Sequence, residues 1–274
     1  MKLITELKGK RYQLDLDNAI SLAIPVKFNG EQPNHFASPI ASSQPLSGGG
    51  FIGDTKQGGS CNVDQIKMVP HCNGTHTESI HHIVDEPISI GAIHSNSISH
   101  CLVLSVTPKT AIQSQDSYIP ELADDDHVID LATLQQQLAG VDISSIQALA
   151  FRTLPNQDHK LSVIYSEQAQ PPFFTREAMQ FISDLPINHL LVDFPSLDKM
   201  YDQGHLSNHH TFWKLEADSH QLSDGAKLER TVTEMIYISD QVSDGFYALS
   251  LQLPAFELDA APSRPLLYPL IELT

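Results

Sequence analysis

The sequence has few cysteines, few basic residues and no long apolar run. Its three cysteines are too few, and odd in number, for a disulfide framework in 274 residues, so we expect reduced thiols. No stretch approaches about 18 consecutive apolar residues, and charges return early in the N-terminal segment. These absences argue against a membrane-spanning helix and a secretory leader, and we expect a cytoplasmic protein.

Basic residues are outnumbered two to one. Sixteen Lys and Arg against 33 Asp and Glu give a formal net charge of −17. That charge would repel nucleic-acid backbones and anionic membrane surfaces. Nucleic acid and membranes are therefore excluded as expected partners, and a small-molecule substrate is favoured. A hydrophobic content of 41% is enough to build a globular core.

Histidine is abundant and unevenly distributed. Of 14 histidines, six fall between His71 and His100, and four fall between His205 and His220. Neutral imidazole is the commonest metal-binding side chain, so these two clusters are where chemistry is expected.

The pattern of apolar residues predicts a single α/β domain over residues 1–274. Two helices are expected, one after an Asp130 N-cap and ending at Gly140, and one from Thr175 to about Leu185. Apolar or alternating runs predict strands at 11–17, 19–24, 63–69, 99–106, 146–151, 189–193, 231–239, 245–253 and 265–273. Residues 29–60 are rich in Gly, Pro, Ser and Asn and predict a long surface loop that serves as a lid or a partner arm.

The segment from Pro70 to His82 gathers nitrogen and oxygen donors. His76 and Glu78 alternate along an extended chain, so both side chains should point to one side. His71 precedes them, His81 and His82 follow, and this donor set suits Zn²⁺ or Mn²⁺. A polar loop with local hydrogen bonds is the alternative.

These residues resemble a known family. The run Gly74-Thr75-His76-x-Glu78-x-x-x-His82 is similar to the H-x-G-T-H-x-D-x-P-x-H motif of the cyclase superfamily of metal-dependent hydrolases, which includes bacterial kynurenine formamidases and isatin hydrolases. Further matches follow in the expected order from about residue 15 to the end. They are Asp193 to Asp198 for D-x-P-S-x-D, His209, Glu234, and Asp259 to Arg264 for D-G-S-P-x-R.

The sequence also departs from the family pattern. The first ligand position falls on Cys72, with His71 one residue earlier, so either His71 or Cys72 could be the ligand; we favour His71 for its longer reach. The family Asp is replaced by Glu78, and the family Pro by Ile80. The stretch from Lys214 to Arg230 is longer than expected and could reshape the rim of the pocket.

The resemblance implies a swivelling β/β/α fold and usually a homo-oligomer, a dimer or a tetramer. It implies hydrolysis of an amide, formamide, cyclic amide or lactone by a metal-activated water, with Zn²⁺ or else Mn²⁺. His82 is the implied general base and acid. The implied ligands are His71, His76, Glu78, His209 and Glu234, with Cys72 or His210 as an alternative ligand or a residue behind the ligands.

Three other residues are candidates for substrate binding. Arg152 at a strand end could bind a carboxylate or form a structural ion pair, Ser196 follows Asp193, and Trp213 could line an aromatic pocket or simply pack. A Ser-His-Asp triad is disfavoured. The alternative function is a non-catalytic metal- or small-ligand-binding protein on the same fold; an interaction protein that uses residues 29–60 would leave the His and Glu spacing unexplained.

Overall fold

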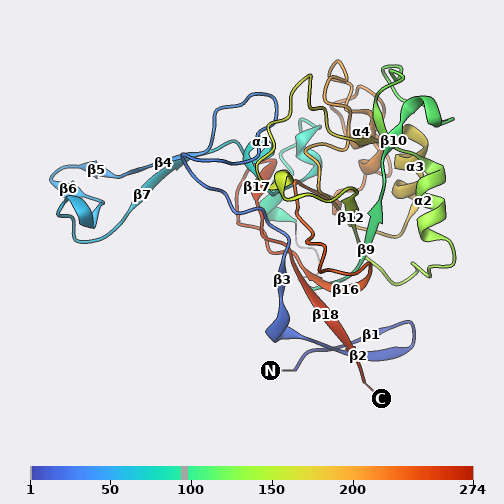
Figure 1. Ribbon diagram of the computed structural model, residues 1–274, viewed down its shortest axis with the longest axis horizontal. Coiled ribbons are helices and arrows are strands. Elements are labelled where there is room, and N and C mark those ends of the chain that lie inside the picture. The colour runs from blue at the N-terminus through green and yellow to red at the C-terminus, as the bar shows by residue number, and fades with distance from the viewer. Residues whose placement is uncertain (1, 94–97, 274) are drawn as a thin grey trace.

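One large mixed sheet organises the chain. The computed structural model describes residues 2–93 and 98–273 (Figure 1). In these residues the strands of the main sheet run in the order β1 (Ile4–Leu7), β2 (Lys10–Leu14), β18 (Leu266–Glu272), β16 (Gly245–Ser250), β9 (Ser99–Val106), β12 (Ala148–Thr153), β14 (His189–Val192), β15 (Thr231–Glu234), β8 (His76–Glu78) and β17 (Ala260–Pro262), with β3 (Ile20–Ser21) beside β18.

The centre of this sheet is parallel and its flanks are antiparallel. Strands β9, β12, β14 and β15 pair in parallel, as expected for strands linked by helical crossovers. β12 and β14 are buried along their whole length, which explains their nearly continuous apolar sequence. The predicted strand, helix, strand unit is confirmed, because α3 (Arg176–Asp184) connects β12 to β14.

Each face of the sheet carries its own core. Leu102 and Leu104 of β9 point to the face that packs against the helices, whereas Cys101 and Val103 point to the opposite face, as the two-residue period of a strand requires. The fold is therefore a mixed α/β fold, as predicted.

Helices cover one face of the sheet (Figure 1). α2 (Leu131–Leu138) begins where the Asp130 carboxylate accepts a hydrogen bond from the Thr133 amide, and α3 begins where the Thr175 hydroxyl accepts one from the Ala178 amide. The Asp130 cap was predicted, and Thr175 was predicted as the start of the second helix. α3 buries Ala178, Met179 and Ile182 and contacts α4 (Ser207–Trp213). None of the described helices is long and apolar enough to cross a membrane.

The arm, residues 42–67, extends away from the body (Figure 1). It is a ribbon in which β4 (Ser42–Pro45) pairs with β7 (Asp64–Lys67) and β5 (Ser47–Gly48) pairs with β6 (Phe51–Ile52). The prediction of a long loop over 29–60 is wrong where β4, β5 and β6 form. The strand predicted at 63–69 is present as β7. The other strands of the ribbon were missed, because a ribbon with neither face buried needs no alternation of apolar residues.

The remaining elements are short. A small sheet contains β10 (Lys109–Thr110), β11 (His127–Ile129) and β13 (Phe173–Phe174). The 3₁₀ helices are η1 (Leu16–Asn18), η2 (Thr55–Gln57), η3 (Ile80–His82), η4 (Ile90–Ala92), η5 (Ala111–Gln113) and η6 (Asp158–Leu161), and the short helix α1 spans Pro70–Asn73. His94 of the first histidine cluster lies outside the described residues.

Candidate metal centre

The first histidine cluster folds into three short elements. α1 carries His71 and Cys72, β8 carries His76 and Glu78, and η3 carries His82. Gly74 between α1 and β8 has an extended backbone, although a glycine beside these donors would suit a tight turn. A Cβ atom at Gly74 would lie 2.9 Å from Cγ2 of Val26, which gives a different reason for the glycine.

β8 places His76 and Glu78 on one side of the strand and Thr77 on the other. The Thr77 hydroxyl lies 2.8 Å from that of Thr233, away from the candidate ligands. β8 lies between β15 and β17, and His76 stands directly opposite Glu234. His76 Nε2 and Glu234 Oε2 are 3.4 Å apart, so the register of this antiparallel pair brings the two side chains together.

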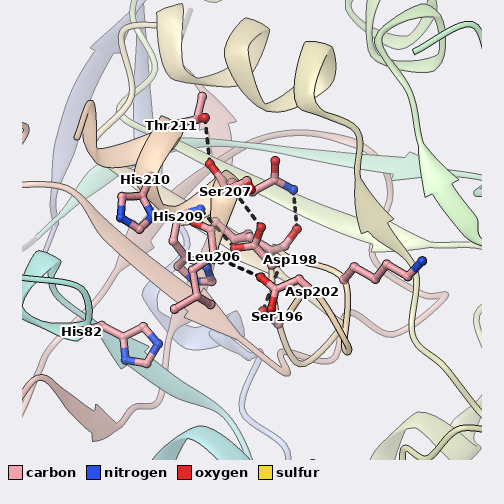
Figure 2. Close-up of polar contacts among 12 residues, drawn as sticks. His82, Ser196, Asp198, Asp202, Leu206, Ser207, His209, His210 and Thr211 are labelled. Carbon is pink, nitrogen blue, oxygen red and sulfur yellow. Dashed lines mark hydrogen bonds and ion pairs between the residues drawn. The ribbon is translucent and has the colours of Figure 1, made fainter. Parts of the chain in front are cut away.

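α4 supplies His209, whose Nε2 lies 2.8 Å from Glu78 Oε1 and 3.5 Å from Glu234 Oε1. The start of this helix is held by two carboxylates (Figure 2). Asp198 accepts from the Asn208 amide at 2.7 Å, and Asp202 accepts from the Leu206 amide at 2.6 Å. Asp198 Oδ2 also lies 2.6 Å from His209 Nδ1, so one carboxylate fixes both the helix and its histidine.

Two oxygens of one side chain connect two sets of potential ligands. Glu78 Oε1 belongs with His209 and Glu234, and Glu78 Oε2 lies 3.1 Å from His71 Nδ1, close to His76. In both sets the donor atoms lie within 4.8 Å of one another. His76 Nε2 and Glu78 Oε2 are buried without a hydrogen-bond partner among the described residues. Buried polar atoms need partners, so the imidazole and carboxylate donors fit a divalent ion.

Proton sharing dominates the electrostatics of these side chains. Burial alone would raise the pKa of Glu78, but the nearby charges of His82 and His209 hold it well below its ordinary value. Burial would lower the pKa of His209, but Glu78 and Asp198 raise it well above the ordinary value. The His209 imidazole is thus favoured in its protonated form, and binding of a metal ion in its place would release that proton.

His82 lies on the exposed side of the centre. Its Nε2 is 3.9 Å from Glu78 Oε2, and its Nδ1 is 3.2 Å from Asp259 Oδ2. Its ring stacks on that of His71 with centroids 4.4 Å apart. His81 points elsewhere, with Nδ1 3.1 Å from the Val84 carbonyl oxygen. The stretch from Lys214 to Arg230 reaches this segment, because His220 Nδ1 lies 2.8 Å from the Ile83 carbonyl oxygen.

The structure does not bring every predicted residue to the centre. Cys72 is buried on α1, burial raises the pKa of its thiol, and it joins none of the potential ligand groups of the described residues. His210 directs its two ring nitrogens at the carbonyl oxygens of Leu206 and Ser219. Neither side chain is therefore directed at the other candidate ligands.

The three candidate substrate-binding residues make contacts of their own. Arg152 donates to Asp244 and to the Ser239 and Val242 carbonyl oxygens, which is the structural ion pair weighed above. The Ser196 hydroxyl accepts from the Asp198 amide at 3.2 Å, and the Trp213 indole donates to the Arg230 carbonyl oxygen at 3.0 Å. Asp193, three residues before Ser196 in the motif, accepts hydrogen bonds from Thr153 and Lys160 instead of contacting a histidine.

Sequence reasoning assigned no role to Asp198, Asp259 or His35. Asp198 and Asp259 stand in motifs that were noticed, and the signal for them was an acidic residue at a fixed place in each motif. His35 comes from the stretch interpreted as a loop. It is 3% exposed, its two ring nitrogens have no partner among the described residues, and its backbone amide donates to the Cys72 carbonyl oxygen. No sequence pattern pointed to it.

Comparison with known proteins supports the resemblance. A family model described as "Putative cyclase" matches residues 15–199, more than half of the chain. That range includes the His-rich segment and Asp198, and it ends before His209 and Glu234. No curated protein matches this chain.

Solved structures share the fold over nearly the whole chain. Isatin hydrolase A from Labrenzia aggregata, bound to benzyl benzoate, is 13% identical with a TM-score of 0.62 and covers 93% of this chain and 94% of its own. Isatin hydrolase A from Ralstonia solanacearum is 15% identical with a TM-score of 0.61, covering 93% and 92%. A predicted metal-dependent hydrolase from Bacillus stearothermophilus is 15% identical with a TM-score of 0.55, covering 92% and 98%.

Proposed function

Because the chain belongs to the cyclase family, whose fold it shares with metal-dependent hydrolases, we propose that it hydrolyses an amide, formamide, cyclic amide or lactone bond. The observation that carries this proposal is the convergence on Glu78 of imidazoles from three separate elements. Isatin hydrolases, among the structural relatives, are named for a cyclic amide substrate. At 13% and 15% sequence identity these relatives share the fold, and an activity screen must identify the bond that this chain cleaves.

We assign His71, His76, Glu78, His209 and Glu234 as the residues that hold the metal, with Zn²⁺ preferred over Mn²⁺. A divalent ion in this donor set supplies Lewis acidity, which polarises a carbonyl group and lowers the pKa of water. Glu78 is the proposed shared ligand because its two oxygens face different partners. Cys72 and His210 stand behind these ligands in the proposal.

His82 is the proposed general base and acid. Its Nε2 faces Glu78 across 3.9 Å, which leaves it beside the ligands without belonging to their buried cluster. In the forward reaction Nε2 accepts one proton from the attacking water, and the water oxygen forms a bond to the carbonyl carbon. As the bond from that carbon to the leaving nitrogen or oxygen breaks, His82 returns the proton to the leaving atom.

A screen of formamides, lactones and cyclic imides tests this function. The protein would be assayed after loading with Zn²⁺ or Mn²⁺ and again after removal of the ion with a chelator. Turnover that appears only in the loaded protein and is lost in His82→Ala is the expected result. Metal binding without turnover on any of these substrates would favour the alternative, a non-catalytic binding protein on the same fold.

The remaining proposals concern the state of the chain in the cell. We propose a single domain over residues 1–274, a cytoplasmic location and a homodimer or homotetramer. The arm supports self-association, because Leu46, Phe51, Ile52 and Ile66 are exposed on it. Its charges balance in a chain of net charge −17, which reduces repulsion between copies that meet there. Sedimentation of the intact chain and of a variant without residues 46–62 tests this proposal.

A further inference from the structure

One oxygen of Asp259 contacts two stacked imidazoles. Asp259 Oδ2 lies 2.8 Å from His71 Nε2 and 3.2 Å from His82 Nδ1. Asp259 immediately precedes β17, and its backbone carbonyl oxygen accepts hydrogen bonds from the amide and the hydroxyl of Ser79. Ser79 in turn precedes η3, which carries His82. The main chain of Asp259 is therefore fixed to the segment that its side chain serves.

These contacts decide which nitrogen of each ring carries a proton. A carboxylate oxygen only accepts, so the rings that share Oδ2 donate through His71 Nε2–H and His82 Nδ1–H. In a neutral imidazole the other nitrogen then has a free lone pair. That nitrogen is Nδ1 in His71, 3.1 Å from Glu78 Oε2, and Nε2 in His82, on the side of the same oxygen.

The separation at Glu78 suits a metal ligand pair. Two donors at roughly 2.0–2.1 Å on one tetrahedral ion are about 3.3–3.4 Å apart, close to the 3.1 Å between His71 Nδ1 and Glu78 Oε2. His209 repeats the arrangement, because its Nδ1 contacts Asp198 while its Nε2 faces Glu78. A carboxylate thus stands behind each of these two imidazoles, as is common for metal-binding histidines.

We propose that Asp259 is a positioning residue that fixes, through one oxygen, the tautomer and the orientation of both the ligand His71 and the base His82. This inference rests on the proposed function for the role of His82. It goes further by linking the base to the metal ligand, so that a change at Asp259 alters both rings together. In this proposal Asp259 acts through the two rings and is assigned neither as a metal ligand nor as the base.

The test compares Asp259→Asn with Glu257→Gln, a matched loss of charge at an exposed carboxylate two residues earlier in the same segment. The first readout is Zn²⁺ affinity, measured by competition with a chromophoric chelator. Loss of a partner behind a metal-binding histidine costs roughly 10- to 100-fold in affinity, and we expect that loss in Asp259→Asn and not in Glu257→Gln. The side-chain amide of Asn can donate toward either ring, which removes the preference for one tautomer.

The second readout is ring ¹⁵N chemical shifts in the Zn²⁺-loaded protein, assigned with His82→Gln. We expect His82 of the wild type to carry its proton on Nδ1, and Asp259→Asn to shift toward the Nε2–H tautomer. If Asp259→Asn moves either readout no more than Glu257→Gln does, the proposal is overturned. If Asp259→Asn fails to fold, Asp259→Glu, with its oxygen displaced by one methylene, must show the same two changes.

Neither readout depends on turnover. A wild type that hydrolyses none of the screened substrates, yet shows the predicted tautomer and affinity changes, would remove the proposed function and leave the positioning role intact. Turnover in the wild type, combined with unchanged ¹⁵N shifts and Zn²⁺ affinity in Asp259→Asn, would support the proposed function and remove the positioning role of Asp259.

Discussion

His209 Nδ1 lies 2.6 Å from Oδ2 of Asp198, and both side chains are fully buried. The same carboxylate accepts the Tyr118 hydroxyl and the backbone amide of Asn208. Burial alone would raise the pKa of Asp198, but the hydrogen bond and the charge of His209 keep it below its ordinary value. Asp198 therefore holds His209 with Nε2 directed at Glu78.

Replacement of Asp198 by Asn should weaken metal binding without abolishing it. The His209 ring would lose the anionic acceptor that fixes its tautomer, a change that typically costs 10- to 100-fold in metal affinity. Equilibrium dialysis against buffered Zn²⁺ measures the effect, with Asp125→Asn, an exposed carboxylate, as the control. Equal affinities in the two variants would show that Asp198 serves only the start of α4.

The metal-free protein should lose stability as the pH rises. Burial would lower the pKa of His71, but its hydrogen bond to Asp259 and the nearby Glu78 carboxylate outweigh burial and raise the pKa from 6.5 to about 10. A raised folded-state pKa gives stability that is complete below the unfolded value and is lost as the pH rises through the folded value. His209 acts in the same direction.

The melting temperature of chelator-treated protein should therefore fall between pH 6.5 and about 10. With Zn²⁺ present the ion replaces those protons, and Zn²⁺ should raise the melting temperature more at pH 8 than at pH 6. Scanning calorimetry of both forms across this range gives the comparison. A Zn²⁺-induced shift that shrinks as the pH rises would contradict the assignment of imidazoles as ligands.

The choice between His71 and Cys72 as ligand can be decided by substitution. His71 Nδ1 lies 3.1 Å from Glu78, whereas the Cys72 thiol joins no ligand group of the described residues. His71→Ala should lower the metal content of dialysed protein, and Cys72→Ser should leave it near that of the wild type. Loss of the ion in Cys72→Ser alone would identify a thiolate site.

His82 should matter for turnover and little for metal content. His82→Ala should reduce kcat by roughly 10²- to 10⁴-fold, the usual range for a positioned acid or base. His76→Ala should lose both the ion and the activity, because His76 Nε2 is buried next to Glu234. His81→Ala is the matched control, since its ring faces the Val84 carbonyl oxygen. If His82→Ala keeps full activity and His81→Ala is inactive, the general base is His81 and the assignment is wrong by one residue.

His35→Phe should stabilise the protein. Burial lowers the pKa of His35 to about 4, so the ring is neutral, and its nitrogens have no partner among the described residues. An unpaired buried polar atom costs about 1–3 kcal/mol, and an apolar ring of similar size removes that cost. Thermal unfolding should show a higher melting temperature. A lower melting temperature would mean that the His35 ring has a hydrogen-bond partner in solution, such as one of the proposed metal-binding side chains.

The strands and helices of the core could be predicted from sequence, because their buried faces give the apolar residues a regular spacing. β9 and α2 match their predicted ranges closely, since β9 is a run of apolar residues buried on both faces, and α2 has one apolar face and a capping residue. Residues 19–24 were expected to form one strand, yet only Ile20 and Ser21 pair with β18, and a single bridge joins Ala23 to Ile236. Pro25 ends this run, and short edge pairings leave little trace in the sequence.

The metal centre was predictable as a set of residue types and unpredictable as an arrangement. Alternation in β8 correctly placed His76 and Glu78 on one side. His76 and Glu234 face each other because of the register between two strands that lie far apart in the sequence. The spacing of residues within one motif cannot reveal that register. The same is true of Asp259, whose contacts with His71 span 188 residues.

The position of β8 between β15 and β17 also sets an order of events during synthesis. The hydroxyls of Thr77 and Thr233, 156 residues apart in the sequence, form a hydrogen bond, and so do Glu78 and His209, which are 131 residues apart. A growing chain on the ribosome carries its first histidine cluster long before the strands that enclose it have been made. Such distant pairings close late, because the entropy of the intervening loop opposes them. The full set of proposed ligands therefore exists only after translation has passed β15, and until then the first histidine cluster of the nascent chain lacks the partners that enclose it.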